Sequence, residues 1–270
     1  MRVALATAKM PAVRKLAHRA IEAAVAVFNR NPWTTQALSL IPRSAESVYD
    51  RDGVRTSHNH SFIDAPSFQR AYRRAVQAAG WDYEIEWRVH VILWAAATAQ
   101  PIPGAFVECG TGRGYMASAI CEHLAWNDRP FYLFDTFQPE SVIGDQHERG
   151  ATRSPYYAND PDTVRENFRA WPGVQLVVGS IPGSLAQVDT GPVAFIHIDM
   201  NHPTPEEAAM RHFWPRLTPG GVMVLDDYAY VGFERSHQSA DRVASELGFP
   251  ILSLPTGQGL AIKPLSMLAG

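Results

Sequence analysis

Three aspartates that follow apolar runs are the residues of this sequence best suited to metal chemistry. Asp199 ends the run at 193–199, and the pair Asp226 and Asp227 lies at the end of the run at 220–226. Adjacent carboxylates repel one another unless they are protonated or a cation neutralises them. Carboxylate oxygens, with room for water and substrate oxygens, suit Mg²⁺. The three aspartates are therefore candidate magnesium ligands, and the alternative is an aspartate pair that caps turns.

A second group is a glycine-rich turn that could hold a nucleotide-type cofactor. Residues 108–114 read Glu-Cys-Gly-Thr-Gly-Arg-Gly, between the apolar run at 105–109 and an apolar helical pattern. Glycine is needed where φ is positive or where the backbone lies against a ligand, and helix N-termini favour anionic groups. The third glycine falls one position earlier than in the dinucleotide fingerprint. The alternative is a glycine-rich turn in another kind of α/β protein.

Polar residues also end the next two apolar runs. Asp135 ends the run at 130–135, where an acid can accept hydrogen bonds from both hydroxyls of a ribose. Gly179 and Ser180 follow the third run. For Asp135 and Ser180 the alternative role is capping of the helix that follows.

These residues need elements that bring distant strand ends together. From residue 105 onward, apolar runs alternate with helical patterns, which is typical of a parallel, doubly wound sheet. We predict an α/β fold with a Rossmann-like, mostly parallel, seven-stranded sheet and an N-terminal helical extension. Ligands bind outside the carboxyl ends of such strands, where the acids lie. The predicted strands are 105–109, 130–135, 174–179, 193–199, 220–226, 250–254 and 258–263, and the predicted helices are 114–126, 161–170, 182–187, 205–215 and 236–247.

The N-terminal third differs in character from the rest. We predict that residues 1–100 form a helical region for oligomerisation or a lid, and that residues 101–270 form the cofactor-binding domain. Apolar residues recur at helical spacing over 10–29, with basic residues near the start. Such a helix can lie on a membrane, but packing on its own domain or on a sister subunit is our interpretation, and it favours a homo-oligomer. A long connection is expected at 31–66, followed by helices at 67–79 and 83–99.

Composition argues against several kinds of partner. The net charge of −3 over 270 residues gives no electrostatic basis for binding nucleic acid. No apolar run has the length of a membrane span, and the N-terminus lacks an uninterrupted apolar signal core. The two cysteines, Cys109 and Cys121, lie in and after the glycine turn, so we expect buried free thiols. A cytoplasmic protein is the resulting expectation.

Six motifs in order carry a resemblance to a known family. They lie at 108–114, 135–137, 179–185, 197–199, 217–221 and 226–228. Together they resemble a class I S-adenosylmethionine-dependent methyltransferase, and more closely the macrocin O-methyltransferase family of metal-dependent sugar O-methyltransferases. The resemblance covers about residues 104–232.

The resemblance implies a role for each motif. Glu108 would accept from the ammonium group of the cofactor, and Ser180 would lie near its adenine edge. A metal ion at Asp199, Asp226 and Asp227 would bind a sugar diol and lower the pKa of the hydroxyl to be methylated. The implied cofactor-binding residues are Glu108, Gly110, Thr111, Gly112, Gly114, Tyr115, Asp135, Thr136, Phe137, Gly179, Ser180 and Asp199.

This chain departs from the family at one motif. The family commonly shows Asp-Gly-Asp-Leu-Tyr where this sequence has Asp199-Met-Asn201-His202-Pro. An amide replaces the second acid, so the site loses charge, and metal dependence stays open.

Methyl transfer is an in-line displacement that needs alignment and deprotonation of the acceptor. The candidate bases are Asp199, His202 and His237, with a structural hydrogen bond as the alternative for either histidine, and segment 138–160 is a candidate acceptor lid.

The expected function is S-adenosylmethionine-dependent O-methylation of a small molecule. The acceptor would be a hydroxyl of a sugar or polyhydroxylated natural product, with Mg²⁺ as a second cofactor. A catechol-type acceptor is the near alternative, because its diol would use the same metal geometry. A nicotinamide-dependent oxidoreductase and a non-catalytic cofactor-binding partner protein are alternatives from other classes, which the glycine spacing and the acidic strand ends disfavour.

Overall fold

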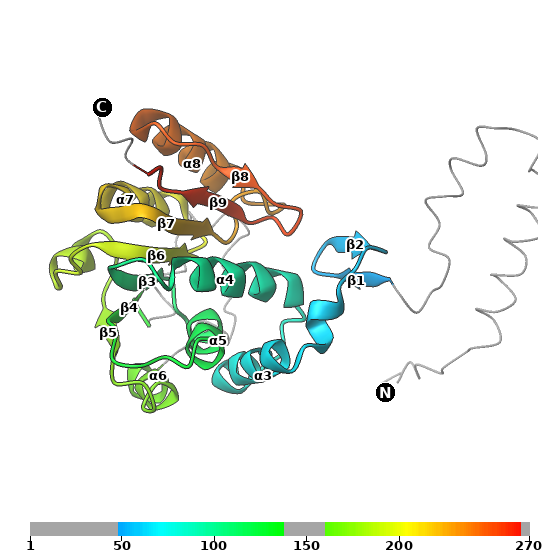
Figure 1. Cartoon of the computed structure of the whole chain (residues 1–270). Helices are drawn as coiled ribbons and strands as arrows, with labels where there is room; N and C mark the ends of the chain where they lie inside the picture. Colours follow the sequence, from blue (N-terminus) through cyan, green and yellow to red (C-terminus); the bar gives the residue numbers. More distant parts are fainter. Residues whose placement is uncertain (1–47, 138–159, 266–270) are drawn as a thin grey trace, which may run out of the picture. The chain divides into compact units, whose positions relative to one another are not determined.

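The computed structural model of the chain describes residues 48–137 and 160–265, and a seven-stranded sheet lies at its centre (Figure 1). The strand order is β5-β4-β3-β6-β7-β9-β8. Strands β3 to β7 pair in parallel, and β8 and β9 join antiparallel at one edge. The predicted Rossmann-like, mostly parallel sheet is confirmed. The strands are β3 (Ala105–Cys109), β4 (Phe131–Asp135), β5 (Val174–Val178), β6 (Val193–Ile198), β7 (Leu217–Leu225), β8 (Leu252–Ser253) and β9 (Gly259–Ile262).

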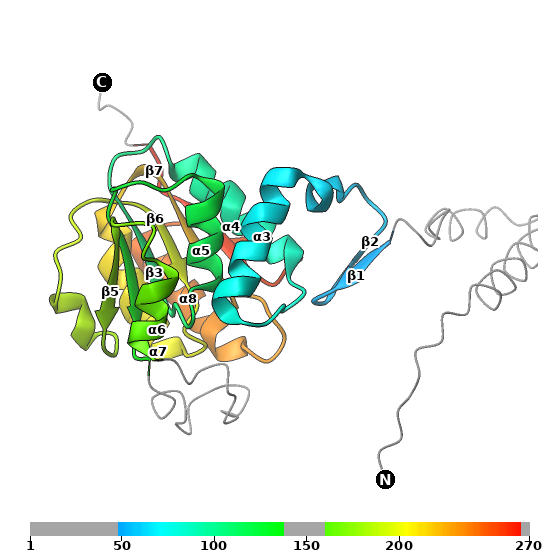
Figure 2. The same ribbon diagram turned by 90° about the horizontal axis from the view of Figure 1, so that it is seen from below.

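Helices cover both faces of this sheet, which explains why its central strands are apolar throughout (Figures 1 and 2). Neighbouring residues of a strand point to opposite faces. Phe106 accordingly lies in one apolar cluster and Val107 in the other. The first cluster packs under α3 (Pro66–Ala79), α4 (Glu86–Ala99), α5 (Tyr115–His123) and α6 (Pro161–Asn167), and the second under α7 (Pro203–Phe213) and α8 (Glu234–Leu247).

Helices α3 and α4 come from the region predicted to be separate from the cofactor domain. Both contribute buried residues to the cluster that contains α5 and the sheet, for example Phe68 and Ile92. Helix α4 also packs against β7, which places its N-terminal turn near the strand ends. The role in oligomerisation or as a lid stays a prediction, and the helix predicted over 10–29 lies outside the described residues.

Several element bounds differ from those predicted. Strand β7 begins at Leu217 instead of residue 220, and the helix predicted over 182–187 is the short 3-10 turn η4 (Gly183–Ala186). A second 3-10 turn, η5 (Trp214–Arg216), follows α7, and η2 (Ser61–Asp64) precedes α3.

Within the predicted irregular connection, β1 (Tyr49–Arg51) and β2 (Val54–Thr56) form a two-stranded sheet. Its turn consists of Asp52 and Gly53, both with positive φ, which is the Asp-Gly signature of a tight hairpin.

The remaining expectations about the chain concern its cysteines and its hydropathy. Cys109 and Cys121 are buried and free, as predicted. In the part of the chain that the structure describes, no helix combines the length and the hydropathy that a membrane span requires.

Candidate active site

The glycine turn between β3 and α5 lies directly against the end of β6. Gly110, Gly112 and Gly114 all have positive φ, at 92°, 54° and 86°. A Cβ on Gly110 would lie 1.7 Å from the carbonyl oxygen of Asp199. Only glycine satisfies both the backbone angle and this close approach. The turn that could hold a cofactor therefore touches the residue predicted to act on the acceptor.

Asp135, at the end of β4, organises the same turn. Its Oδ2 accepts from the N–H of Gly112 at 2.7 Å, and its Oδ1 accepts from the N–H of Phe137 at 2.7 Å. Burial raises the pKa of Asp135, and these hydrogen bonds oppose the rise. Two carboxylate oxygens offer about four acceptor positions. Asp135 thus holds the turn, and it lies at the strand end where an acid can meet ribose hydroxyls, so these residues fit a nucleotide-type cofactor. The other predicted cofactor residues lie at the same strand ends: Thr111 and Tyr115 beside the glycines, Thr136 after β4, and Gly179 and Ser180 after β5.

Glu108 is buried and paired with a histidine that the sequence analysis did not single out as a site residue. Its Oε1 lies 3.1 Å from Nδ1 of His197, whose Nε2 lies 3.5 Å from Oδ1 of Asp226. Burial alone would lower the pKa of His197, but Asp226 and Glu108 outweigh it and raise that pKa to about 10. The ring of His197 therefore joins the glycine-turn strand to the acidic strand ends, with a carboxylate near each of its nitrogens. The predicted contact of Glu108 with a cofactor ammonium group stays a prediction.

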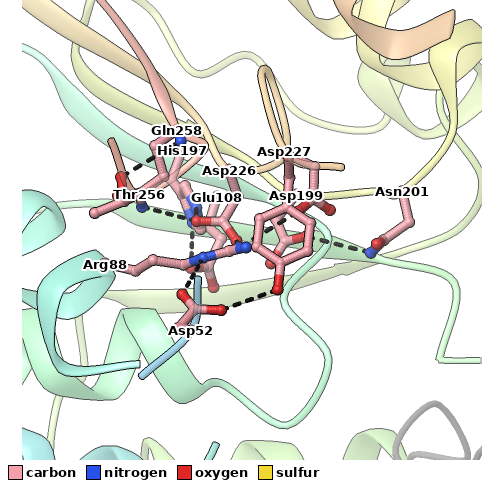
Figure 3. Close-up of polar contacts among 11 residues, drawn as sticks. Asp52, Arg88, Glu108, His197, Asp199, Asn201, Asp226, Asp227, Thr256 and Gln258 are labelled. Carbon is pink, nitrogen blue, oxygen red and sulfur yellow. Dashed lines mark hydrogen bonds and ion pairs between the residues drawn. The ribbon is translucent and has the colours of Figure 1, made fainter. Parts of the chain in front are cut away.

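The side chain of Arg88, from α4, reaches the aspartates at the ends of the strands (Figure 3). The side chain of Arg88 is only 8% exposed. Its Nε donates to Oδ2 of Asp52 at 2.9 Å, and its Nη1 donates to Oδ2 of Asp226 and, at 3.3 Å, to Oδ1 of Asp227. The positive charges of Arg88 and His197 hold the pKa of Asp226 below its usual range despite its burial. The pKa of Asp199 is instead raised well above its ordinary value by burial and by the carboxylates of Asp226 and Asp227.

The predicted magnesium site must accommodate this arginine. Among the described residues, ligand atoms of His197, Asp199 and Asp226 lie within 4.8 Å of one another, a spacing that a shared cation could use. Arg88, however, already contacts two of the three predicted aspartates. Asn201 donates from Nδ2 to Oδ1 of Asp199 at 3.3 Å, where the family commonly has an acid. Because Mg²⁺ would have to displace the guanidinium, the residues in this arrangement do not fit the ion.

The three predicted bases occupy different surroundings. Asp199 is partly exposed between the glycine turn and the acidic cluster. His202 is the N-cap of α7, and its Nδ1 accepts from the N–H of Thr204 at 3.1 Å. His237, on α8, has Nδ1 at 2.8 Å from the carbonyl oxygen of Tyr228 and Nε2 at 3.3 Å from Oδ2 of Asp241. Both histidines thus make the structural hydrogen bonds considered as their alternative, and the choice of base stays a prediction.

Sequence reasoning missed four polar residues of this cluster: Asp52, Arg88, His197 and Gln258. Two of them carried a usable signal. Asp52 belongs to an Asp-Gly turn, and His197 interrupts an otherwise apolar strand next to Asp199. Arg88 also interrupts an apolar helical pattern, but nothing in the local sequence says which acids it would meet.

Similarity to known proteins agrees with the geometry. Residues 107–228 match the family described as "Methyltransferase domain". This segment is a methyltransferase domain. The resemblance to class I methyltransferases is thereby confirmed at the level of the domain. Arg88 and Gln258 lie outside the matched segment, although both contact Asp226 within it. Asp52 also lies outside the segment and contacts Arg88.

Two curated relatives and one solved structure illustrate the similarity. The chain is 28% identical over 145 residues, or 48% of its length, to 8-demethyl-8-(2,3-dimethoxy-alpha-L-rhamnosyl)-tetracenomycin-C 4'-O-methyltransferase of Streptomyces olivaceus. It is 26% identical over 163 residues, or 54% of its length, to mycinamicin III 3''-O-methyltransferase of Micromonospora griseorubida. These matches span 55% and 64% of the two relatives. The structure of the O-methyltransferase NovP shares the fold, with a TM-score of 0.58, 20% identity and coverage of 72% of this chain and 89% of that one.

Proposed function

We propose that the chain is an S-adenosylmethionine-dependent O-methyltransferase that methylates a hydroxyl of a sugar or polyhydroxylated natural product. The observation that carries the proposal is the contact between Gly110 and Asp199, because it joins a cofactor turn to an acid that can face an acceptor. Both curated relatives are O-methyltransferases, and the name of one contains a rhamnosyl group. These names support the class of acceptor.

The donor would be held at the carboxyl ends of β3, β4 and β5. The glycine turn would receive its methionine and ribose portions, and Asp135, which holds this turn, would meet the ribose hydroxyls. Gly179 and Ser180, after β5, would face the adenine end. S-adenosylmethionine supplies an electrophilic methyl group. The sulfur leaves as a neutral thioether, so no acid is needed to protonate it.

Asp199 is the base that the geometry favours. It lies at the contact between the glycine turn and the acidic cluster, whereas His202 and His237 are engaged in hydrogen bonds elsewhere. A carboxylate whose pKa is raised accepts a proton more readily than an ordinary aspartate. We therefore infer that Asp199 removes the proton of the acceptor hydroxyl while the glycine turn aligns the donor for in-line attack.

Magnesium at Asp199, Asp226 and Asp227 is implied by the resemblance alone, and the contacts of Arg88 with two of these aspartates argue against it. Cytoplasmic residence and assembly through the N-terminal helices also stay predictions.

Calorimetry with S-adenosylhomocysteine and with NAD tests the cofactor class. We expect binding of S-adenosylhomocysteine and none of NAD, followed by transfer of a labelled methyl group to rhamnosylated acceptors in preference to catechols. Tight binding of NAD without binding of S-adenosylhomocysteine would contradict the proposal and favour an oxidoreductase. Preference for catechols would change the acceptor class alone.

A further inference from the structure

We propose that Arg88 is the resident cation of the acidic cluster, so that this chain transfers its methyl group without a divalent metal ion at these aspartates. The inference rests on the proposed methyltransferase function. It concerns the residue that neutralises Asp226 and Asp227, which the family resemblance assigns to magnesium.

Arg88 is enclosed at the cluster on several sides. Its guanidinium contacts Asp52, Asp226 and Asp227, and its Cζ lies 4.2 Å from the ring centroid of Tyr230. A guanidinium is costly to bury unless carboxylates and hydrogen bonds compensate its charge. Three carboxylates and an aromatic face supply that compensation here. The arrangement is therefore a built binding position for a cation.

Asp226 has donors for both of its oxygens. Oδ2 accepts from Arg88, and Oδ1 accepts from Nε2 of Gln258 at 2.8 Å, with His197 beside it (Figure 3). Gln258 is fully buried and is itself fixed, because its Oε1 accepts from the hydroxyl of Thr256 at 2.9 Å. A divalent ion at Asp226 would thus compete with Arg88, Gln258 and His197 for the same two oxygens.

The side of Arg88 that faces the hairpin is fixed as well. Asp52, in the turn between β1 and β2, accepts from Nε of Arg88 on Oδ2 and from the hydroxyl of Tyr230 on Oδ1 at 3.0 Å. Tyr230 follows the aspartate pair by three residues, so the same loop supplies two acids and the aromatic face. These contacts oppose withdrawal of Arg88 from the cluster.

The chemistry changes with the cation. A guanidinium stays protonated at all working pH values, so it neutralises the aspartates permanently. It has no open coordination position of the kind that a metal ion offers, so it cannot act as a Lewis acid that lowers the pKa of an acceptor hydroxyl. The proton of the acceptor must then pass to a protein base, and Asp199, the base inferred above, would take it. The acceptor oxygen then forms the bond to carbon as the carbon–sulfur bond breaks, and sulfur keeps the electron pair.

Binding of Mn²⁺, followed by electron paramagnetic resonance, tests the proposal directly. We expect no saturable Mn²⁺ site in the wild-type protein and one new site in Arg88→Met, which keeps an unbranched, flexible side chain but removes the charge. Arg74→Met is the matched control, because Arg74 is a partly buried arginine that stacks on Trp171 and has no aspartate contact among the described residues. It should gain no site. Saturable binding by the wild type, or none by Arg88→Met, would overturn the proposal.

Thermal unfolding of the wild type gives a second measurement that needs no variant to fold. A ligand that binds the native state raises the melting temperature. We expect S-adenosylhomocysteine to raise it, and Mn²⁺ and EDTA to leave it unchanged. A rise with Mn²⁺ overturns the role of Arg88 alone, whereas no rise with S-adenosylhomocysteine counts against the proposed function.

Discussion

At the scale of single residues, Gly110 has the least freedom to vary. Its φ of 92° disfavours any L side chain, and a Cβ would lie 1.7 Å from the carbonyl oxygen of Asp199. Gly110→Ala should lower the free energy of unfolding by about 2 kcal/mol or more and weaken binding of S-adenosylhomocysteine. Urea denaturation and calorimetry would measure the two effects.

Gly183→Ala is the matched control for that substitution. Gly183 has no positive φ, and a Cβ there would meet nothing within 4 Å. Its replacement should leave stability and binding close to those of the wild type. Equal behaviour of the two variants would show that the contact between Gly110 and Asp199 is not as close as described.

The charge of His197 predicts a pH dependence of stability. Its pKa is about 10 in the folded chain and about 6.5 when unfolded, because Glu108 and Asp226 stabilise the imidazolium. The folded state thus holds an extra proton between these values, and stability from His197 falls as pH rises. The advantage of the wild type over His197→Asn should be full below about pH 6.5 and lost toward pH 10.

Urea denaturation across that pH range would measure this advantage. His58→Asn is a suitable control, because His58 is exposed and its replacement should change the free energy of unfolding little. If the wild type exceeds His197→Asn in free energy of unfolding by the same amount from about pH 6 to about pH 10, His197 does not carry an imidazolium charge.

At the scale of elements, Arg88 connects α4 to the β1–β2 hairpin and to the end of β7. Removing one partner of a buried ion pair leaves the other charge uncompensated and typically costs about 3–5 kcal/mol. Arg88→Met should cost about that much, since it leaves Asp226 and Asp227 without their cation. Asp52→Asn should cost less in the Arg88→Met background than in the wild type, because its charge partner is already gone.

A double-mutant cycle from urea denaturation measures this coupling. We expect a coupling free energy of about 1–3 kcal/mol between Arg88 and Asp52. Additive effects of the two substitutions would mean that the hairpin turn does not stabilise Arg88.

At the scale of the whole sheet, the strand order separates two tasks. Strands β4 and β5 lie on one side of β3 and would serve the donor, whereas β6 and β7 lie on its other side and carry the acidic cluster. Asp135→Ala should therefore weaken binding of S-adenosylhomocysteine by about tenfold or more, since it removes charge-assisted hydrogen bonds. Asp199→Asn should leave that binding nearly intact and lower kcat by about two to four orders of magnitude.

Calorimetry and methyl-transfer assays on both variants would separate these tasks. Loss of donor binding in Asp199→Asn would show that Asp199 holds the cofactor, as the resemblance also implies. Unchanged kcat in Asp199→Asn would return the role of base to His202 or His237.

The sequence by itself determined the donor half of the molecule. Three local patterns indicate this half: the glycine turn, the alternation of apolar runs with helices, and the acid that ends β4. Each depends on residues that are close in sequence, so it can be recognised without knowledge of the tertiary contacts. Strand bounds from 105 to 135 were predicted to within one residue for this reason. The prediction failed at β7, where Thr218-Pro-Gly-Gly looks like a turn but continues the strand.

Only the tertiary structure decided what neutralises the acidic half. Arg88 meets Asp226 across 138 residues of sequence, and Asp52 approaches it from a hairpin predicted to be irregular. The aspartate pattern favoured a cation, but a pattern of acids does not distinguish Mg²⁺ from a guanidinium. Packing of α4 against β7 makes that choice, because it sets which positive charge reaches the strand ends.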